Sequence, residues 1–158
     1  MTTKVNLVAE IRNGKPFLEN LLVEQLGTNC YRLVHSPGLV PGLAAGDEFE
    51  LAESELHGYR LLNHGGNVSV QILFSHGTNE CRKTLVPMVE QIGGWLDGET
   101  SGSSSGLLVF TFPVRTGFPT IENVMATAKI ISPDCECYYG NVYDLNDGVT
   151  PLNWWIQT

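Results

Sequence analysis

Basic side chains are the scarcest kind in this sequence. Lysine and arginine number nine among 158 residues, against seventeen acidic residues, and charged side chains make up only 16% of the chain. The shortage is greatest in residues 91–158, which hold seven acidic residues but only Arg115 and Lys129 as bases. A chain with a net charge of −8 repels phosphate backbones, so we expect no binding to nucleic acid. A basic protein partner fits this charge better, and solubility alone is the simpler explanation.

Long hydrophobic runs are also missing. The uncharged apolar stretches are a few residues long, far short of the roughly 20 residues that a transmembrane helix requires. Residues 1–4 lead directly into a strand-like pattern, which predicts no signal peptide. We therefore expect a cytoplasmic protein with no membrane partner. In that compartment the cysteines are expected to stay reduced: Cys30, Cys81, Cys135 and Cys137.

No catalytic, cofactor or metal motif is recognisable either. Cys135 and Cys137 would share one face of a strand, but structural zinc normally has four ligands, and two small buried side chains explain the pair more simply. Cys81 and His76 could form a nucleophile pair, yet Cys81 falls on an apolar helix face, whereas a reactive thiolate needs an electropositive setting. The serines of 101–106 lack the spacing of a nucleophile elbow. We predict no enzyme, no cofactor and no metal site.

Alternating apolar residues and closely spaced turn signals are present in residues 1–66. They predict a series of strands, with a proline- and glycine-rich loop at 36–46. The expected strands cover 5–11, 18–26, 30–35, 48–52 and 58–62. Because short antiparallel strands must close or cover their edges, we predict a small antiparallel β-barrel-like N-terminal half.

Residues 67–158 predict the order strand, helix, strand, strand, helix, strand. The expected elements are a strand at 67–74, a helix capped by Thr78 and ending at Ile92, a hairpin of 95–100 and 107–114, a helix at 119–131 and a strand at 135–143. Pro87 predicts a kink or a late start of the first helix, and the Ser/Gly tip at 101–106 should be mobile. The order is that of a ferredoxin-like βαββαβ half. The predicted fold is therefore α+β, with the barrel-like half at 1–66 packed on the ferredoxin-like half as one compact unit.

Acidic and aromatic side chains gather in the predicted last strand and the tail that follows it. This cluster consists of Asp134, Glu136, Tyr138, Asp144, Asp147, Trp154 and Trp155. Tyrosine and tryptophan framed by carboxylates suit the recognition of a cationic protein surface. The alternative is a tail that folds back over the open face of the sheet, with one tryptophan buried and the carboxylates simply solvated.

Three short motifs resemble a family of uncharacterised bacterial proteins that is known only as a domain of unknown function. They are Cys30-Tyr-Arg-Leu33, Ser36-Pro-Gly38 and Gly46-Asp47, followed by the predicted βαββαβ half. The resemblance covers about residues 20–130, and the chain departs from the family in its Ser/Gly tip and its tryptophan tail. It implies an accessory or immunity protein encoded beside a toxin. Gly46 and Asp47 have a structural explanation, because glycine permits a tight entry into the strand and aspartate can hold loop amides.

The charge, the cluster and the resemblance favour a non-enzymatic inhibitor. We expect a cytoplasmic immunity protein that neutralises a cognate bacterial toxin through the acidic and aromatic cluster. The alternative is a small-molecule sensor or accessory protein that uses the cleft between the two halves. An enzyme ranks last, because the sequence shows no convergent set of nucleophile, base and oxyanion donor.

Overall fold

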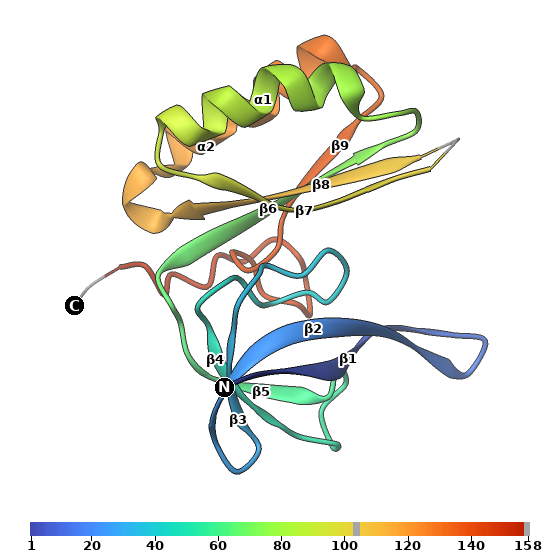
Figure 1. Cartoon of the computed structure of the whole chain (residues 1–158), viewed down its shortest axis with the longest axis vertical. Helices are drawn as coiled ribbons and strands as arrows, with labels where there is room; N and C mark the ends of the chain where they lie inside the picture. Colours follow the sequence, from blue (N-terminus) through green and yellow to red (C-terminus); the bar gives the residue numbers. More distant parts are fainter. Residues whose placement is uncertain (103–104, 157–158) are drawn as a thin grey trace.

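The computed structural model describes residues 1–102 and 105–156 and has an α+β fold, in which two antiparallel sheets are joined by a shared set of loops (Figure 1). The first sheet contains β1 (Thr2–Arg12), β2 (Lys15–Gly27), β3 (Cys30–Leu33), β4 (Glu48–Leu51) and β5 (Tyr59–Asn63). The rest of the chain contains β6 (Asn67–Phe74), α1 (Asn79–Gln91), β7 (Trp95–Ser101), β8 (Gly106–Pro113), a short 3-10 helix (Val114–Thr116), α2 (Phe118–Ile131) and β9 (Glu136–Tyr139). The α+β class that the sequence predicts is confirmed.

The first sheet is a meander in which each strand pairs with the next along the chain. The turn between β1 and β2 places Asn13 and Gly14 at φ values of 51° and 76°, and two positive values are what the two-residue type I′ hairpin turn requires. Alternate side chains of β1, such as Leu7, are buried in the core of this half. The two ends of the sheet approach each other, since the Val8 N–H donates to the carbonyl of His57 at 3.0 Å.

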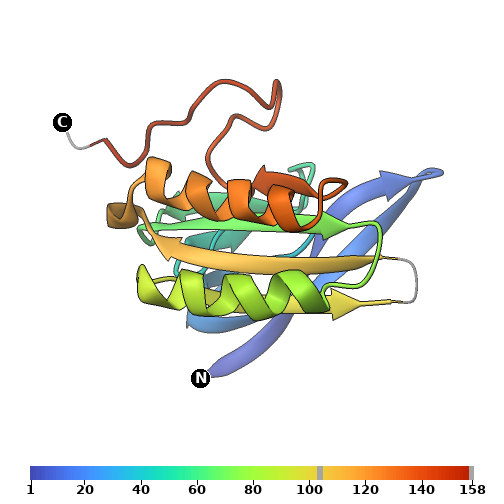
Figure 2. The ribbon, with the colours of Figure 1, turned by 90° about the horizontal axis from the view of Figure 1, so that it is seen from above.

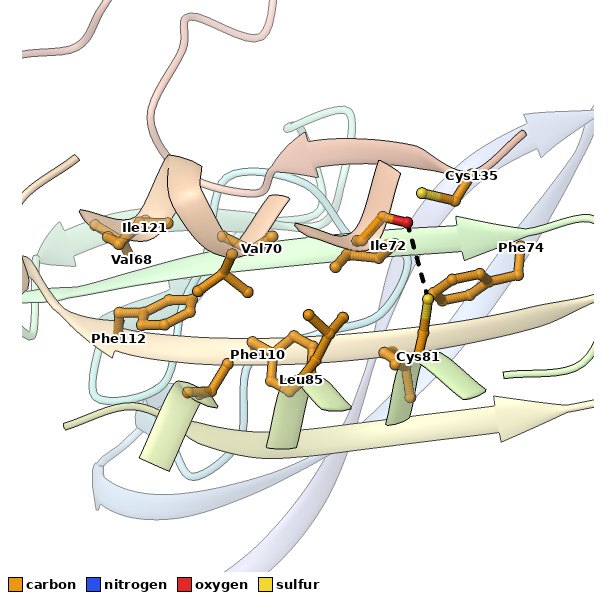
Figure 3. Close-up of a cluster of buried hydrophobic side chains, with 14 of the residues drawn as sticks. Val68, Val70, Ile72, Phe74, Cys81, Leu85, Phe110, Phe112, Ile121 and Cys135 are labelled. Carbon is orange, nitrogen blue, oxygen red and sulfur yellow. Dashed lines mark hydrogen bonds between the residues drawn. The ribbon is translucent and has the colours of Figure 1, made fainter. Parts of the chain in front are cut away.

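The second sheet has the strand order β7-β8-β6-β9, and α1 and α2 lie side by side over one of its faces (Figures 1 and 2). Alternate side chains of β6 and β8 point toward the helices and pack there (Figure 3). This core includes Val68, Val70, Ile72, Phe74, Cys81, Leu85, Phe110, Phe112, Ile121 and Cys135. Each fully buried leucine or phenylalanine contributes roughly 2–3 kcal/mol to folding, so this core fixes the sheet that carries the candidate site. In the described part of the chain, no helix is long and apolar enough to cross a membrane.

Two segments far apart in the sequence meet near the junction of the sheets: the loop at 36–46, which lies between the sheets (Figure 1), and the tail after β9, which runs along the β9 side of the molecule (Figure 2). The Gly42 N–H of the loop donates to the Gly140 carbonyl of the tail at 2.8 Å. The loop also contacts the second sheet through the buried hydroxyls of Ser36 and Thr111, which are 2.6 Å apart. These contacts position the segments that surround the candidate site.

Two details of the predicted first helix are wrong. Thr78 precedes α1, but its side chain makes no capping hydrogen bond and is buried instead. The helix begins at Asn79 and continues through Pro87, so the late start is not found. The Ser/Gly tip expected to be mobile spans 101–106: Ser101 ends β7 and Gly106 begins β8, and residues 103–104 lie outside the described residues.

The predicted last strand is too long. β9 has four residues and does not cover 135–143. Beyond β9, the Asn141 side chain takes over the pairing with β6: its Oδ1 accepts the Ser69 N–H at 3.1 Å, and its Nδ2 donates to the Asn67 carbonyl at 2.8 Å. The chain can therefore leave the sheet while the buried backbone groups of β6 keep their hydrogen-bond partners.

Candidate functional site

β9 lies at an edge of the second sheet and carries the first part of the predicted acidic and aromatic cluster. Glu136 of β9 is exposed, and so is Asp134, two residues before the strand. Tyr138 is 48% exposed, and its hydroxyl donates to the carboxylate of Glu136. On the other face of β9, the Tyr139 hydroxyl donates to Glu122 of α2 at 3.2 Å. The edge strand therefore presents carboxylates and an aromatic ring together.

Asp144 and Asp147 lie in the tail after β9, where each holds a turn. Asp144 Oδ1 accepts the Asn146 N–H at 2.7 Å. Asp147 Oδ1 accepts the N–H groups of Val149 and Thr150 at 2.8 and 2.9 Å. Hydrogen bonds from the Thr150 hydroxyl and from these two amides lower the pKa of Asp147, so its exposed carboxyl is ionised at neutral pH.

The four carboxylates of this region lack a positive partner within the described residues. The arginines that form ion pairs use other glutamates: Arg12 uses Glu10, Arg32 uses Glu24 and Glu48, Arg60 uses Glu50 and Glu55, and Arg82 uses Glu99. The region thus carries negative charge that no ion pair offsets. We call it the acidic surface, and it consists of Asp134, Glu136, Tyr138, Asp144 and Asp147.

The two tryptophans of the tail are half-buried and hold it against both halves of the chain. Trp154 donates its Nε1–H to the Asn141 carbonyl at 2.8 Å and stacks on His64, with the ring centres 4.6 Å apart. Trp155 packs edge-on against Phe118 at 4.9 Å. Both rings therefore have an internal role, as expected for a tail that folds back. Contact of either ring with a partner stays a prediction.

A pocket of 650 Å³ opens beside the acidic surface, between the loop at 36–46 and the second sheet. Its wall combines side chains of both halves with the tail: Leu39, Val40, Pro41, Gln71, Leu73, Leu107, Tyr138, Tyr143, Asp144 and Leu145. Several of these apolar side chains are largely exposed, with Leu39 at 49% and Leu145 at 51%. We call it the first pocket. It places uncovered apolar area directly beside the acidic surface.

A histidine–aspartate pair that the sequence analysis left unpaired lies between the halves. His35 Nδ1 is 2.7 Å from Oδ1 of Asp97 in β7. The Asp97 side chain is 2% exposed and accepts two more hydrogen bonds at 2.7 Å, from the Ser36 N–H and the Thr111 hydroxyl. The two residues are 62 positions apart, so no local pattern could pair them. The one sequence signal of this pair was Asp97 itself, which follows the apolar Leu96 in the predicted strand. A carboxylate that is buried there needs hydrogen-bond partners.

Asp47 has the structural role that its motif predicts. Its side chain is fully buried, and its two oxygens accept the N–H groups of Ala44 and Gly65 at 2.9 and 2.7 Å. Gly46 has a φ of 89°, as expected for a tight entry into β4. Burial raises the pKa of Asp47 from about 3.8 to about 6. This residue holds the loop at 36–46 against the link between the halves.

The cysteine pair of the last strand lies under α2. Cys135 is fully buried, and burial raises the pKa of the Cys137 thiol to about 12. Cys81 packs in the same core, with its Sγ 3.9 Å from the Ala128 carbonyl oxygen, as drawn in Figure 3. Across residues 1–102 and 105–156, no three histidine, cysteine or acidic side chains lie close enough to hold a metal ion. The thiols are core side chains.

The chain belongs to the family described as a domain of unknown function (DUF4265), which matches residues 19–130. This match confirms the resemblance carried by the short motifs of the first half. The matched range contains the loop at 36–46 and the His35–Asp97 pair, and it ends before the acidic surface. The acidic surface therefore lies outside the part of the chain that defines the family.

The fold is similar to that of a hypothetical protein from Neisseria gonorrhoeae known from its crystal structure. The two chains are 15% identical, the match covers 89% of this chain and 94% of the other, and the TM-score is 0.65. At this identity the likeness concerns the fold alone. No curated protein matches the chain.

Proposed function

We propose that this protein is a non-enzymatic inhibitor that binds a basic partner protein through the acidic surface. The proposed class of protein is a cytoplasmic immunity protein that neutralises a toxin domain. The observation that carries the proposal is the set of four carboxylates without a lysine or arginine partner among the described residues. Such uncompensated charge speeds association with a positive partner and loses its effect as salt rises.

Apolar side chains beside the acidic surface supply the second half of a binding interface. Tyr138 and Leu145 are about half exposed and line the first pocket next to Asp144. Partially exposed aromatic and aliphatic anchors carry much of the binding energy of protein interfaces, while charges set rate and specificity. The combination supports docking of a basic protein that inserts an apolar side chain into the first pocket.

The finer architecture belongs to the same proposal. We propose a barrel-like half at 1–66 and a ferredoxin-like half at 67–158, packed as one unit. The hydrogen bond between Val8 and His57 supports a nearly closed first sheet. The order β7-β8-β6-β9 with both helices on one face supports the ferredoxin-like description. The two hydrophobic clusters draw on residues 7–49 and 68–142, which supports the division.

The decisive experiment compares charge variants in their binding to individual basic proteins. The tagged full chain is used to isolate partners from its native cells, and the association rate of each purified partner is then measured. The double variant Asp134→Asn/Glu136→Gln should lower that rate by at least about tenfold, and so should a rise from about 50 to about 500 mM salt.

The matched control is the double variant Glu53→Gln/Glu90→Gln, which removes the same charge from exposed positions elsewhere. It should leave the association rate within about twofold. Equal rates for both double variants, or partners that bind independently of salt, would overturn the proposed surface.

The first pocket supports a second candidate, a small-molecule sensor. Its wall comes from both halves of the chain, as expected for a ligand site at such a junction. A metabolite that raises the melting temperature of the wild type should fail to do so with Leu73→Asp in the pocket wall. The control Leu62→Asp changes a similarly exposed leucine on β5. If Leu73→Asp keeps the full shift, the first pocket is not the site.

A further inference from the structure

A pocket of 320 Å³ lies between β5, the loop at 36–46 and the tail after β9. We call it the aromatic pocket. Its wall consists of three aromatic rings, three leucines, one carboxylate and a glycine: Tyr59, His64, Trp154, Leu61, Leu145, Leu152, Asp144 and Gly42. Ligand sites commonly occupy roughly 300 to 1,000 Å³, so this pocket suits a small molecule.

The two larger rings of the aromatic pocket are anchored by hydrogen bonds to residues that do not line it. The Tyr59 hydroxyl donates to the Pro41 carbonyl at 2.7 Å. Trp154 donates its Nε1–H to the Asn141 carbonyl at 2.8 Å, and His64 stacks on its ring. Because their polar atoms are engaged with the protein, Tyr59 and Trp154 offer a ligand their rings and no free hydrogen-bond donor.

Asp144 brings a negative charge to the aromatic pocket. Its side chain is half-buried and forms no ion pair with a lysine or arginine of the described residues. Oδ1 accepts the Asn146 N–H at 2.7 Å, whereas Oδ2 accepts no hydrogen bond within residues 1–102 and 105–156. A half-buried carboxylate oxygen without a donor favours a bound cation.

Among the described residues, no positive side chain offsets this charge in the wall of the pocket. Neither lysine nor arginine lines it there. The Nδ1 atom of His64 is buried without a hydrogen-bond partner in that part of the chain, and an imidazolium would place an unpaired N–H at this atom. Burial also lowers the pKa of His64, so its ring is neutral at pH 7. The aromatic pocket therefore combines one uncompensated negative charge with aromatic and aliphatic walls.

We propose that the aromatic pocket binds a small alkylated ammonium cation, a quaternary ammonium compound of the choline type. The charge of the cation pairs with Asp144, and its methyl groups pack against the rings of Tyr59 and Trp154. Aromatic rings attract such cations electrostatically, and this attraction grows when the cation is desolvated. The pocket shares Asp144 with the acidic surface, but its occupant is a small molecule, so the site does not depend on the inhibitor proposal.

The experiment uses three probes with the full-length protein: choline, its uncharged isostere 3,3-dimethylbutan-1-ol, and ethanolamine. The isostere keeps the shape and removes the charge, whereas ethanolamine keeps the charge and removes the methyl groups. Two-dimensional amide NMR gives both the affinity and the location. Choline should bind roughly tenfold more tightly than either of the others and shift amide signals of residues 42, 59–64, 144–145 and 152–154.

One variant tests the assignment of the counter-charge. Asp144→Asn removes the charge, while its side-chain oxygen can still accept the Asn146 N–H, and it should weaken choline binding roughly tenfold. The control Glu53→Gln removes a charge from an exposed position outside the pocket and should leave the affinity for choline unchanged. Equal affinity of the wild type for choline and 3,3-dimethylbutan-1-ol, or full affinity for choline in Asp144→Asn, would overturn the proposal.

Discussion

The Asp47 carboxyl is buried, which raises its pKa, and hydrogen-bonded to two amides, which lowers its pKa. Burial has the larger effect on the pKa. Its pKa lies near 6 in the folded protein, against about 3.8 for an exposed aspartate. Between these two values the folded state binds the proton more tightly than the unfolded state. The free energy of unfolding therefore falls as pH rises from about 4 to 6 and is constant above that range with respect to this group. The difference amounts to about 3 kcal/mol at most.

Replacing Asp47 with asparagine should remove this pH dependence. Asp47→Asn should also destabilise the protein by about 1–3 kcal/mol, because one of the amides of Ala44 and Gly65 would face the new NH₂ group. Urea unfolding at several pH values gives the wild-type advantage, which should be larger at pH 4.5 than at pH 7. Asp147→Asn is the contrast, since the lowered pKa of Asp147 predicts a contribution that is lost as pH falls. A wild-type advantage that is independent of pH would contradict the role of Asp47.

At the scale of elements, the position of the chain at the end of β9 depends on the close approach of Gly140 to β6. A Cβ at Gly140 would lie 2.0 Å from Ser69 Oγ and 2.7 Å from Gln71 Nε2. Gly140→Ala should therefore push the tail away from β6 and cost about 1–3 kcal/mol in the free energy of unfolding. Gly77→Ala is the control, because nothing lies within 4 Å of its Cβ position. Denaturant unfolding of both variants checks this, and equal stability would show that the approach is not tight.

Most elements could be predicted from the sequence, because their signals are local. The Asn13-Gly14 turn and the β6 strand follow from spacing within a few residues. The end of β9 could not be predicted, because Asn141 bonds to a residue 72 positions away. The same limit applies to the site: the acidic residues were visible as a cluster, whereas His35 and Asp97 meet only in the folded chain.

At the scale of the whole molecule, buried polar contacts join the halves. The Thr111 hydroxyl of β8 lies 2.6 Å from the Ser36 hydroxyl and donates to Asp97 at 2.7 Å. Thr111→Val keeps the shape but leaves both oxygens short of a partner, so it should cost about 1–3 kcal/mol. Thr111→Ser keeps the hydroxyl and should cost clearly less. Chemical unfolding of the two variants measures this, and an equal loss in both would assign the effect to packing.

The loop at 36–46 lines two pockets, so molecules bound in the two pockets would affect each other's affinity. Leu39 and Leu107 line both the first pocket and a pocket of 510 Å³ between β1 and β2 of the first sheet and β7 and β8 of the second. A molecule that shifts these side chains from one pocket changes the shape of the other. Linkage is reciprocal, so the factor by which an occupant of one pocket changes the affinity of the other pocket for its occupant is the same in both directions.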